Sequence, residues 1–428
     1  MDSQQAEHKG SLISAIFLVA GTCVGGGMLV LPLATGISGF LPSIIVMAIS
    51  WFAMTATGLL LIEISLWLEE GAHIITMTSR ILGPIGKGVS WLLYLFICYA
   101  STVAYTAGGG VQISAALENF FHVPISKDLG CLIFILFFGT VIYFGSWFVG
   151  RINTILFTAL VAAYFLLVGM GLDEVNMQLL YHRDWRSSFI AIPLLLTAFS
   201  FQTMVPSLTP YLKRNVKALR MTIVGGTSLA FVIYFVWQWI ILGIVPVEGP
   251  DGLAVALAKG DQPATVFLRQ HVNGVWISVI AEYFAFFAIV TSFLGIALGL
   301  FDFLSDGLKI KKEKWGSILL GLLIAIPTLI FATKFERAFM AAMDVSGGLG
   351  DSLLNGIIPV LMIWRGRYYM NFPNTFRVPG GRILLIALAS FFVVSLTIEI
   401  LGLLGITPIF YEAYDIMKIH NLEEVLTH

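Results

Sequence analysis

The sequence has little charge: Asp, Glu, Lys and Arg make up only 11% of its 428 residues, against about a quarter in soluble domains. A chain with 58% hydrophobic residues and so few charges cannot cover its surface with well-solvated groups, which excludes a soluble globular protein. It contains no long run of like charges, and its net charge of −1 gives no indication of nucleic-acid binding. The composition therefore predicts an all-α polytopic membrane protein.

Cysteine and catalytic motifs are equally scarce. Cys23, Cys98 and Cys131 lie in apolar segments without CxxC spacing, so neither a disulfide nor a metal site is expected. The sequence also lacks HExxH, GxSxG and any repeated acidic metal-binding motif, which argues against an enzyme. We therefore expect no cofactor, and no metal other than a coupling Na⁺.

Apolar windows of about 20 residues, the length that crosses a bilayer, recur eleven times along the chain. They cover residues 11–36, 40–67, 88–116, 129–148, 152–171, 188–212, 221–246, 274–304, 315–333, 339–364 and 383–407. With a cytoplasmic N-terminus, about two thirds of the 24 Lys and Arg residues face the inside, as the positive-inside rule requires. The odd number of spans then places the C-terminus outside.

The first span contains the sequence GTCVGGGM, from Gly21 to Met28. Four glycines in eight residues, each costing about 1 kcal/mol relative to Ala in a helix, are expected to break this span at mid-membrane depth. A broken helix survives in lipid only where it lines a cavity. The half-helix that restarts near Gly27 points its positive end at that cavity, which suits an anion. The alternative is a glycine seam for close helix packing.

Span six, SFIAIPLLLTAFSFQTMVPSLTPYL, is the second interrupted segment. It contains three prolines and a polar cluster, which are Pro193, Pro206, Pro210, Ser200, Gln202 and Thr203. Because five spans separate the two breaks, the pattern is typical of two repeats of opposite topology, although two unrelated breaks are the alternative. The expected organisation is a cytoplasmic N-terminus (1–10), repeats at 11–171 and 188–364, an eleventh helix (383–407) and an external tail (408–428).

Three motifs stand out: VAGTCVGGGMLVLPL (Val19 to Leu33), FSFQTMVPSLTPYL (Phe199 to Leu212) and TSFLGIALGLFDFLSDGL (Thr291 to Leu308). Together they resemble the hydroxy and aromatic amino acid permease family, the tyrosine/tryptophan permease branch of the amino acid/polyamine/organocation superfamily. The resemblance implies a LeuT-like fold with five plus five inverted repeats, an eleventh transmembrane helix, and breaks in helices 1 and 6. It also implies cation-driven import of tyrosine or tryptophan across the bacterial cytoplasmic membrane by alternating access.

The resemblance also implies where the substrate binds. Backbone N–H groups would hold the α-carboxylate at the first break, which comprises Thr22, Cys23, Gly25, Gly26 and Gly27. Carbonyl groups of span six near Phe199 and Ser200 would hold the α-ammonium. An aromatic side chain needs an apolar slot with a polar handle, for which the candidates are Phe201, Gln202, Tyr99, Tyr105, Phe284 and Phe287. Packing in the core or against lipid is the alternative for each aromatic residue.

The coupling ion is either Na⁺ or H⁺. Hydroxyls and carbonyls hold Na⁺ in sodium-coupled members of the superfamily, at positions that correspond here to Gly21, Val24, Ala288, Thr291 and Ser292. The alternative is that the two hydroxyls bond back to carbonyls of their own helix.

A proton route needs titratable groups, but no histidine lies in a predicted span and span five lacks the lysine of some proton-coupled relatives in the superfamily. Carboxylates within the membrane are functional candidates by default, so Glu63, Glu282 and Asp351 are considered as a proton relay. Glu63 has the alternative of pairing with a base from a loop, and Asp351 is expected to line an outer vestibule. Since the family is described as proton-coupled, H⁺ is slightly favoured over Na⁺.

Two other functions remain open from the sequence. One is a symporter for serine or small neutral amino acids, and the other is a channel or substrate sensor without uphill transport. Uptake assays would separate both from the main hypothesis.

Overall fold

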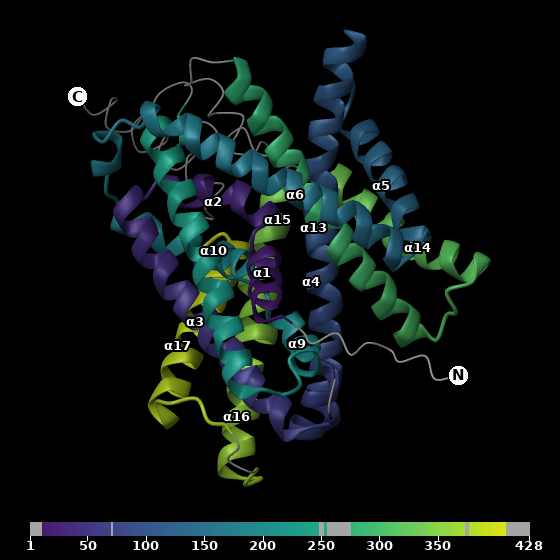
Figure 1. Ribbon diagram of the computed structural model, residues 1–428, viewed down its shortest axis with the longest axis vertical. Helices are drawn as coiled ribbons and strands as arrows, with labels where there is room; N and C mark the ends of the chain where they lie inside the picture. Colours follow the sequence, from purple (N-terminus) through teal and green to yellow (C-terminus); the bar gives the residue numbers. More distant parts are fainter. Residues whose placement is uncertain are drawn as a thin grey trace.

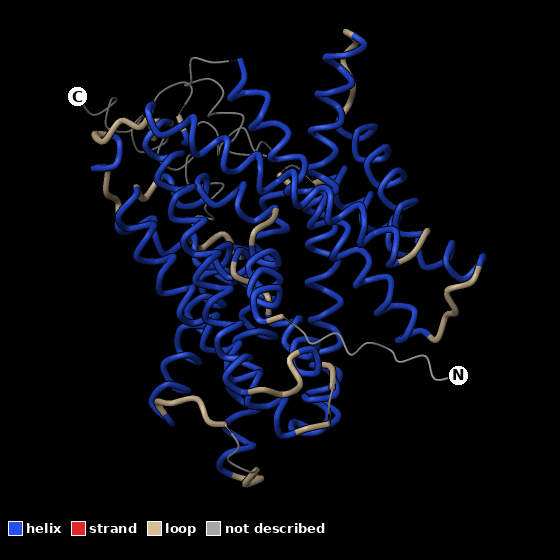
Figure 2. Tube along the Cα trace, viewed as in Figure 1, coloured by secondary structure: helices blue, strands red, loops and turns tan. Residues whose placement is uncertain are grey.

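The computed structural model describes residues 11–69, 72–247, 252–254, 275–335, 337–372 and 376–407. Within these ranges the chain forms helices and their connections, without any strand (Figure 2). The two predicted tails, 1–10 and 408–428, lie outside the described residues.

The first half of the chain consists of five predicted spans. Its helices are α1 (Leu12–Cys23), α2 (Gly26–Gly36), α3 (Phe40–Trp67), α4 (Ile74–Phe121), α5 (Lys127–Tyr143) and α6 (Ser146–Gly171). The connection to span six contains the short elements η1 (Leu172–Glu174), η2 (Leu179–Tyr181), α7 (Trp185–Ser188) and η3 (Phe189–Ala191).

The second half contains the other six predicted spans. Its elements are α8 (Ile192–Ala198), η4 (Gln202–Met204), α9 (Val205–Tyr211), α10 (Val216–Ile244), α13 (Val275–Leu308), α14 (Lys314–Lys334), α15 (Ala338–Val345), η5 (Ser346–Ile357), α16 (Ile358–Tyr368) and α17 (Gly381–Leu403). Figure 1 shows α1 near the middle of the bundle, and α1 packs against α10 while α13 packs against α4 and α6.

Among the described residues, nine helices are long and apolar enough to cross a membrane, and the bent pair α1 and α2 provides a tenth span. Helix α5 has 17 residues, which at 1.5 Å per residue gives about 26 Å, just short of the hydrocarbon thickness. Each of the eleven predicted windows therefore corresponds to one helix or to one interrupted helix.

The start of span three differs from the prediction, because α4 begins at Ile74 rather than near residue 88. Gly83 interrupts it with φ 85° and ψ −166°, a backbone conformation that favours glycine. Pro84 then suits the first turn of the continuing helix, where its missing N–H costs little. The apolar segment that precedes Gly83 is therefore a short helical arm that leads into the span.

Both predicted breaks are present. Helices α1 and α2 meet at an angle of 53°, and span six stops at Ala198 and resumes at Gln202. Pro193 and Pro206 occupy the first turns of α8 and α9. These two prolines thus start half-helices instead of interrupting them, and the break falls between them.

Span ten contains a feature that the sequence did not predict. Residues Ser346–Ile357 form a π-helix between α15 and α16, a geometry that occurs frequently at functional sites. Gly347 and Gly348 allow close contacts here, because a side-chain carbon at Gly347 would collide with the Pro193 carbonyl. Span ten therefore lies directly against span six, and it also packs against α17.

Candidate functional site

A cavity of about 510 Å³ adjoins the two helix breaks. It is lined by residues of α1, α2, α4, α6, α8, η4, α13, α15 and η5 together with the chain at the breaks. The sequence-predicted residues on its wall are Gly21, Thr22, Cys23, Gly25, Gly27, Tyr105, Ser200, Thr291, Ser292 and Asp351. Residues distant in the sequence thus converge on one cavity.

At the first break, the start of α2 lies against α4 and α13. The Gly26 N–H donates to the Ser292 hydroxyl at 3.1 Å. A side-chain carbon at Gly26 would collide with the Tyr105 ring, and one at Gly25 would collide with Ser292. The first N–H groups of a helix have no partner within it and carry partial positive charge, so this break can bind an anion such as a carboxylate.

At the second break, Ser200 faces span ten. Its hydroxyl donates to Asp351 Oδ1 at 2.7 Å, and the Asn355 amide donates to the same oxygen at 2.5 Å. The other carboxylate oxygen, Oδ2, is buried without a hydrogen-bond partner among the described residues. The π-helix and its glycines bring Asp351 to the cavity wall beside the second break.

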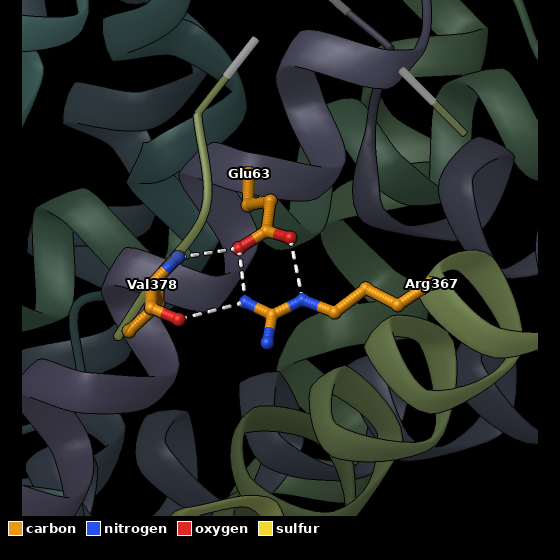
Figure 3. Close-up of polar contacts among 3 residues, drawn as sticks. All are labelled: Glu63, Arg367 and Val378. Atoms are coloured by element: carbon orange, nitrogen blue, oxygen red, sulfur yellow. Dashed lines mark hydrogen bonds and ion pairs between the residues drawn. The ribbon is translucent and has the colours of Figure 1, made fainter. Parts of the chain in front are cut away.

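The carboxylates considered as a proton relay lie in three different environments. The Glu63 carboxylate accepts hydrogen bonds from Arg367 Nε at 2.7 Å and from the Val378 N–H at 2.8 Å (Figure 3). Glu63 is thus paired with a base, as in the alternative, although Arg367 lies in the last turn of α16 and not in a loop. Glu63 is not on the cavity wall. Glu282 is exposed on α13, also away from the cavity. Asp351 is the only one of the three that reaches the cavity in the described structure.

Several predicted slot residues lie away from the cavity. The Tyr99 hydroxyl donates to the Leu323 carbonyl of α14 at 2.8 Å, because Tyr99 and Tyr105 lie on different faces of α4. Phe284 is fully buried and packs against Trp237, with ring centroids 5.1 Å apart. Phe287 stacks on Tyr283.

The aromatic residues near the second break are not on the cavity wall either. Phe199 is buried against Tyr234, with ring centroids 5.2 Å apart. Phe201 is fully buried and faces Gly58. The Gln202 amide donates to the Met54 carbonyl at 3.1 Å, so it ties the break to α3.

The predicted Na⁺ ligands belong to α1, to the first break and to α13. Gly21, Thr291 and Ser292 line the cavity, whereas Val24 and Ala288 are not among its lining residues. The Thr291 hydroxyl donates to the Phe287 carbonyl at 2.8 Å, which is the bond within its own helix considered as the alternative. The same hydroxyl oxygen is 3.2 Å from the carbonyl oxygen of Ala288, and its lone pairs can still accept.

Several residues of the cavity wall were not predicted from the sequence. On α4 they are Tyr94, Ile97, Cys98 and Ser101, and the helical period places Ile97 and Ser101 on the same face as Tyr105. On other elements they include Asn153, Thr154, Phe157, Thr197, Met204 and Met343. The helical spacing from Tyr105 could have identified the α4 residues, whereas no feature of the sequence indicated the α6 residues.

One end of the cavity reaches the surface. Phe17 and Leu18, in the first half of α1, line it and are 56% and 46% exposed. Thr154 in the first half of α6 and Gly299 in the second half of α13 also line the cavity. These positions belong to the ends of the spans that the charge pattern assigns to the cytoplasm.

Comparisons with known proteins agree with this architecture. Residues 8–399 match the sequence model of the tryptophan/tyrosine permease family. The chain is 30% identical to a tryptophan-specific transport protein of Haemophilus influenzae, with 92% of this chain and 97% of the relative covered. It is 31% identical to tyrosine-specific transport system 1 of the same organism, with 87% and 92% covered.

A solved structure is also similar. The crystal structure of MhsT in complex with L-phenylalanine superposes with a TM-score of 0.63 at 14% sequence identity, covering 95% of this chain and all of that one. At this identity the likeness concerns the fold alone.

Proposed function

The chain belongs to the tryptophan/tyrosine permease family, and on that premise we propose that it imports aromatic amino acids across the bacterial cytoplasmic membrane by secondary active symport. Membership confirms the resemblance found in the sequence, and the all-helical architecture with its likeness to MhsT confirms the LeuT-like fold. Residues 11–171 and 188–364 are proposed as the two inverted repeats, followed by α17.

The convergence of two broken helices on one cavity is the observation that carries this proposal. The α-carboxylate of the substrate binds the N–H groups at the start of α2, where Ser292 supplies the present partner of Gly26. The α-ammonium binds at the second break near Ser200, where unwound backbone carbonyls favour positive charge.

The substrate side chain is proposed to be aromatic. The relatives named for tryptophan and for tyrosine are almost equally similar to this chain, so both amino acids are candidate substrates. A volume of about 510 Å³ is within the range of small-molecule sites. Tyr105, Phe157 and Ile97 on its wall provide apolar surface for a large ring.

We propose H⁺ as the coupling ion. This proposal is supported by Asp351, which places a buried carboxylate on the cavity wall. A proton taken up by Asp351 from the outside and released to the inside accompanies the substrate. The N-terminus is proposed to be cytoplasmic, as the positive-inside rule favours, and the cavity is proposed to open on that side.

Uptake of labelled tryptophan and tyrosine into proteoliposomes tests the function, with a pH gradient and a Na⁺ gradient imposed separately. We expect accumulation with the pH gradient, inhibition by unlabelled aromatic amino acids and loss on addition of a protonophore. Accumulation with the Na⁺ gradient alone would contradict H⁺ coupling. Preferential competition by serine would contradict the aromatic substrate, and equilibration without accumulation would indicate a channel or sensor.

A further inference from the structure

One buried side chain touches both helix breaks. Tyr234 lies on α10 and is 0% exposed. Its hydroxyl oxygen is 2.5 Å from the carbonyl oxygen of Cys23 and 2.8 Å from that of Ala198. Cys23 is the last residue of α1 and Ala198 is the last residue of α8. The hydroxyl therefore lies between the carboxyl ends of two half-helices from opposite halves of the chain.

The carbonyl groups at the end of a helix lack partners within it and carry partial negative charge. Two such groups that converge on one point create a place that favours a cation, and half-helix ends in transporters of broken-helix construction serve this purpose. A tyrosine hydroxyl has only one proton, so both carbonyls must share it. The hydroxyl hydrogen thus supplies a partial positive charge at a point where the two carbonyl groups could bind a cation with a full positive charge.

We propose that the Tyr234 hydroxyl is a built-in replacement for a bound cation and positions both breaks for substrate binding. Tyr234 is not on the cavity wall, so it acts through the backbone on either side. Gly25 follows Cys23 by two residues, and Ser200 follows Ala198 by two residues. Because the tyrosine is covalently attached, the spacing of the breaks does not depend on the concentration of any ion. The positioning role rests on the proposed transport function.

The alternative is that Tyr234 has a purely structural role, in which its buried hydroxyl only needs a hydrogen-bond acceptor. Tyr164 provides a matched control for this alternative. The Tyr164 hydroxyl donates to the carbonyl of Ile233 at 3.0 Å, and Tyr164 is 9% exposed. Tyr164→Phe removes a hydrogen bond of the same chemistry without touching either break. A purely structural role predicts the same consequences for Tyr164→Phe and Tyr234→Phe.

The test compares binding of labelled tryptophan or tyrosine to the purified wild-type, Tyr234→Phe and Tyr164→Phe proteins, in choline chloride and in NaCl of equal ionic strength. In choline we expect Tyr234→Phe to weaken binding about 10-fold, as for the loss of one buried hydrogen bond, and Tyr164→Phe to leave it within about twofold. Na⁺ should restore much of the affinity of Tyr234→Phe, since the two carbonyls are free to bind the ion. Equal affinities of the two variants would overturn the positioning role, and indifference of Tyr234→Phe to Na⁺ would overturn the replacement of a cation.

Two further measurements separate the hydroxyl from the ring of Tyr234 and cation binding from substrate binding. Replacement of Tyr234 by p-aminophenylalanine retains N–H donors at the same place, so we expect binding close to wild type; a loss equal to that of Tyr234→Phe would assign the effect to ring packing and refute the inference. The second measurement is the melting temperature in NaCl and in choline chloride, which needs no substrate. We expect Na⁺ to raise the melting temperature of Tyr234→Phe more than that of the wild type. If the wild type binds neither amino acid, the proposed function fails, while this thermal measurement still decides whether the carbonyl pair takes a cation.

Discussion

The carboxylate of Glu63 and the guanidinium of Arg367 form a two-pronged ion pair between residues 304 positions apart in the sequence (Figure 3). Their side chains are only 1% and 2% exposed. The Val378 backbone completes the cluster, because its N–H donates to Glu63 and its carbonyl accepts from Arg367. This contact joins the end of α3 to the end of α16 and to the segment that leads into α17.

Glu63→Gln should destabilise the protein by about 3–5 kcal/mol, because it leaves the buried Arg367 charge without its counter-charge. The matched control is Glu69→Gln, which removes the ion pair between Glu69 and Arg80. This pair is at the surface, with side chains that are 84% exposed for Glu69 and 64% exposed for Arg80. That change should cost less than about 1 kcal/mol. Thermal unfolding of the two variants in detergent measures the difference, and equal midpoints would show that the buried pair adds no stability.

Gly26→Ala should reduce uptake to background while the protein still inserts and purifies, since a methyl group at Gly26 meets the Tyr105 ring. Gly295 is on the cavity wall, but a side-chain carbon there has nothing within 4 Å. Gly295→Ala should therefore retain most of the transport. The measurement is the initial uptake rate per inserted protein, and wild-type transport by Gly26→Ala would exclude the first break from the substrate site.

The fold was predictable from the sequence because hydropathy and the positions of glycine and proline are local signals. The site was only partly predictable, because the face that a residue presents depends on packing. Tyr105 lines the cavity whereas Tyr99, six positions earlier, bonds to α14. Tyr234 gave no signal, since its role depends on carbonyl groups 211 and 36 positions away.

Asp351→Asn should abolish accumulation driven by a pH gradient while exchange of internal for external substrate continues, because the amide cannot take up the coupling proton. Glu282→Gln is the control, since Glu282 is exposed and away from the cavity. Accumulation and counterflow measured in the same proteoliposomes separate coupling from substrate binding. Accumulation by Asp351→Asn at the wild-type level would remove Asp351 from the proton route.

Thr154→Cys should react with a charged, membrane-impermeant thiol reagent from the cytoplasmic side only, and substrate should slow the reaction. Thr154 lines the cavity, whereas its neighbour Ile155 is 69% exposed and not on the wall. Ile155→Cys, which faces lipid, should react far more slowly. The test needs a background without Cys23, Cys98 and Cys131. Labelling of Thr154→Cys from the outside alone would reverse the proposed orientation.

Lowering the pH should destabilise the arm that precedes Gly83, through His73 at the start of α4. Burial lowers the pKa of His73 below its usual value, and its ring packs against Tyr94 with centroids 5.3 Å apart. The unfolded chain therefore binds a proton more readily than the folded one, so stability is retained above about pH 6.5 and falls as the pH drops below it. His73→Gln removes this titration and should show a smaller decrease in melting temperature between pH 7.5 and pH 5.5 than the wild type. Equal decreases for both proteins would assign the acid sensitivity to other groups. A smaller decrease for His73→Gln would identify His73 as a pH-sensitive contact of Tyr94, which lies on the cavity wall.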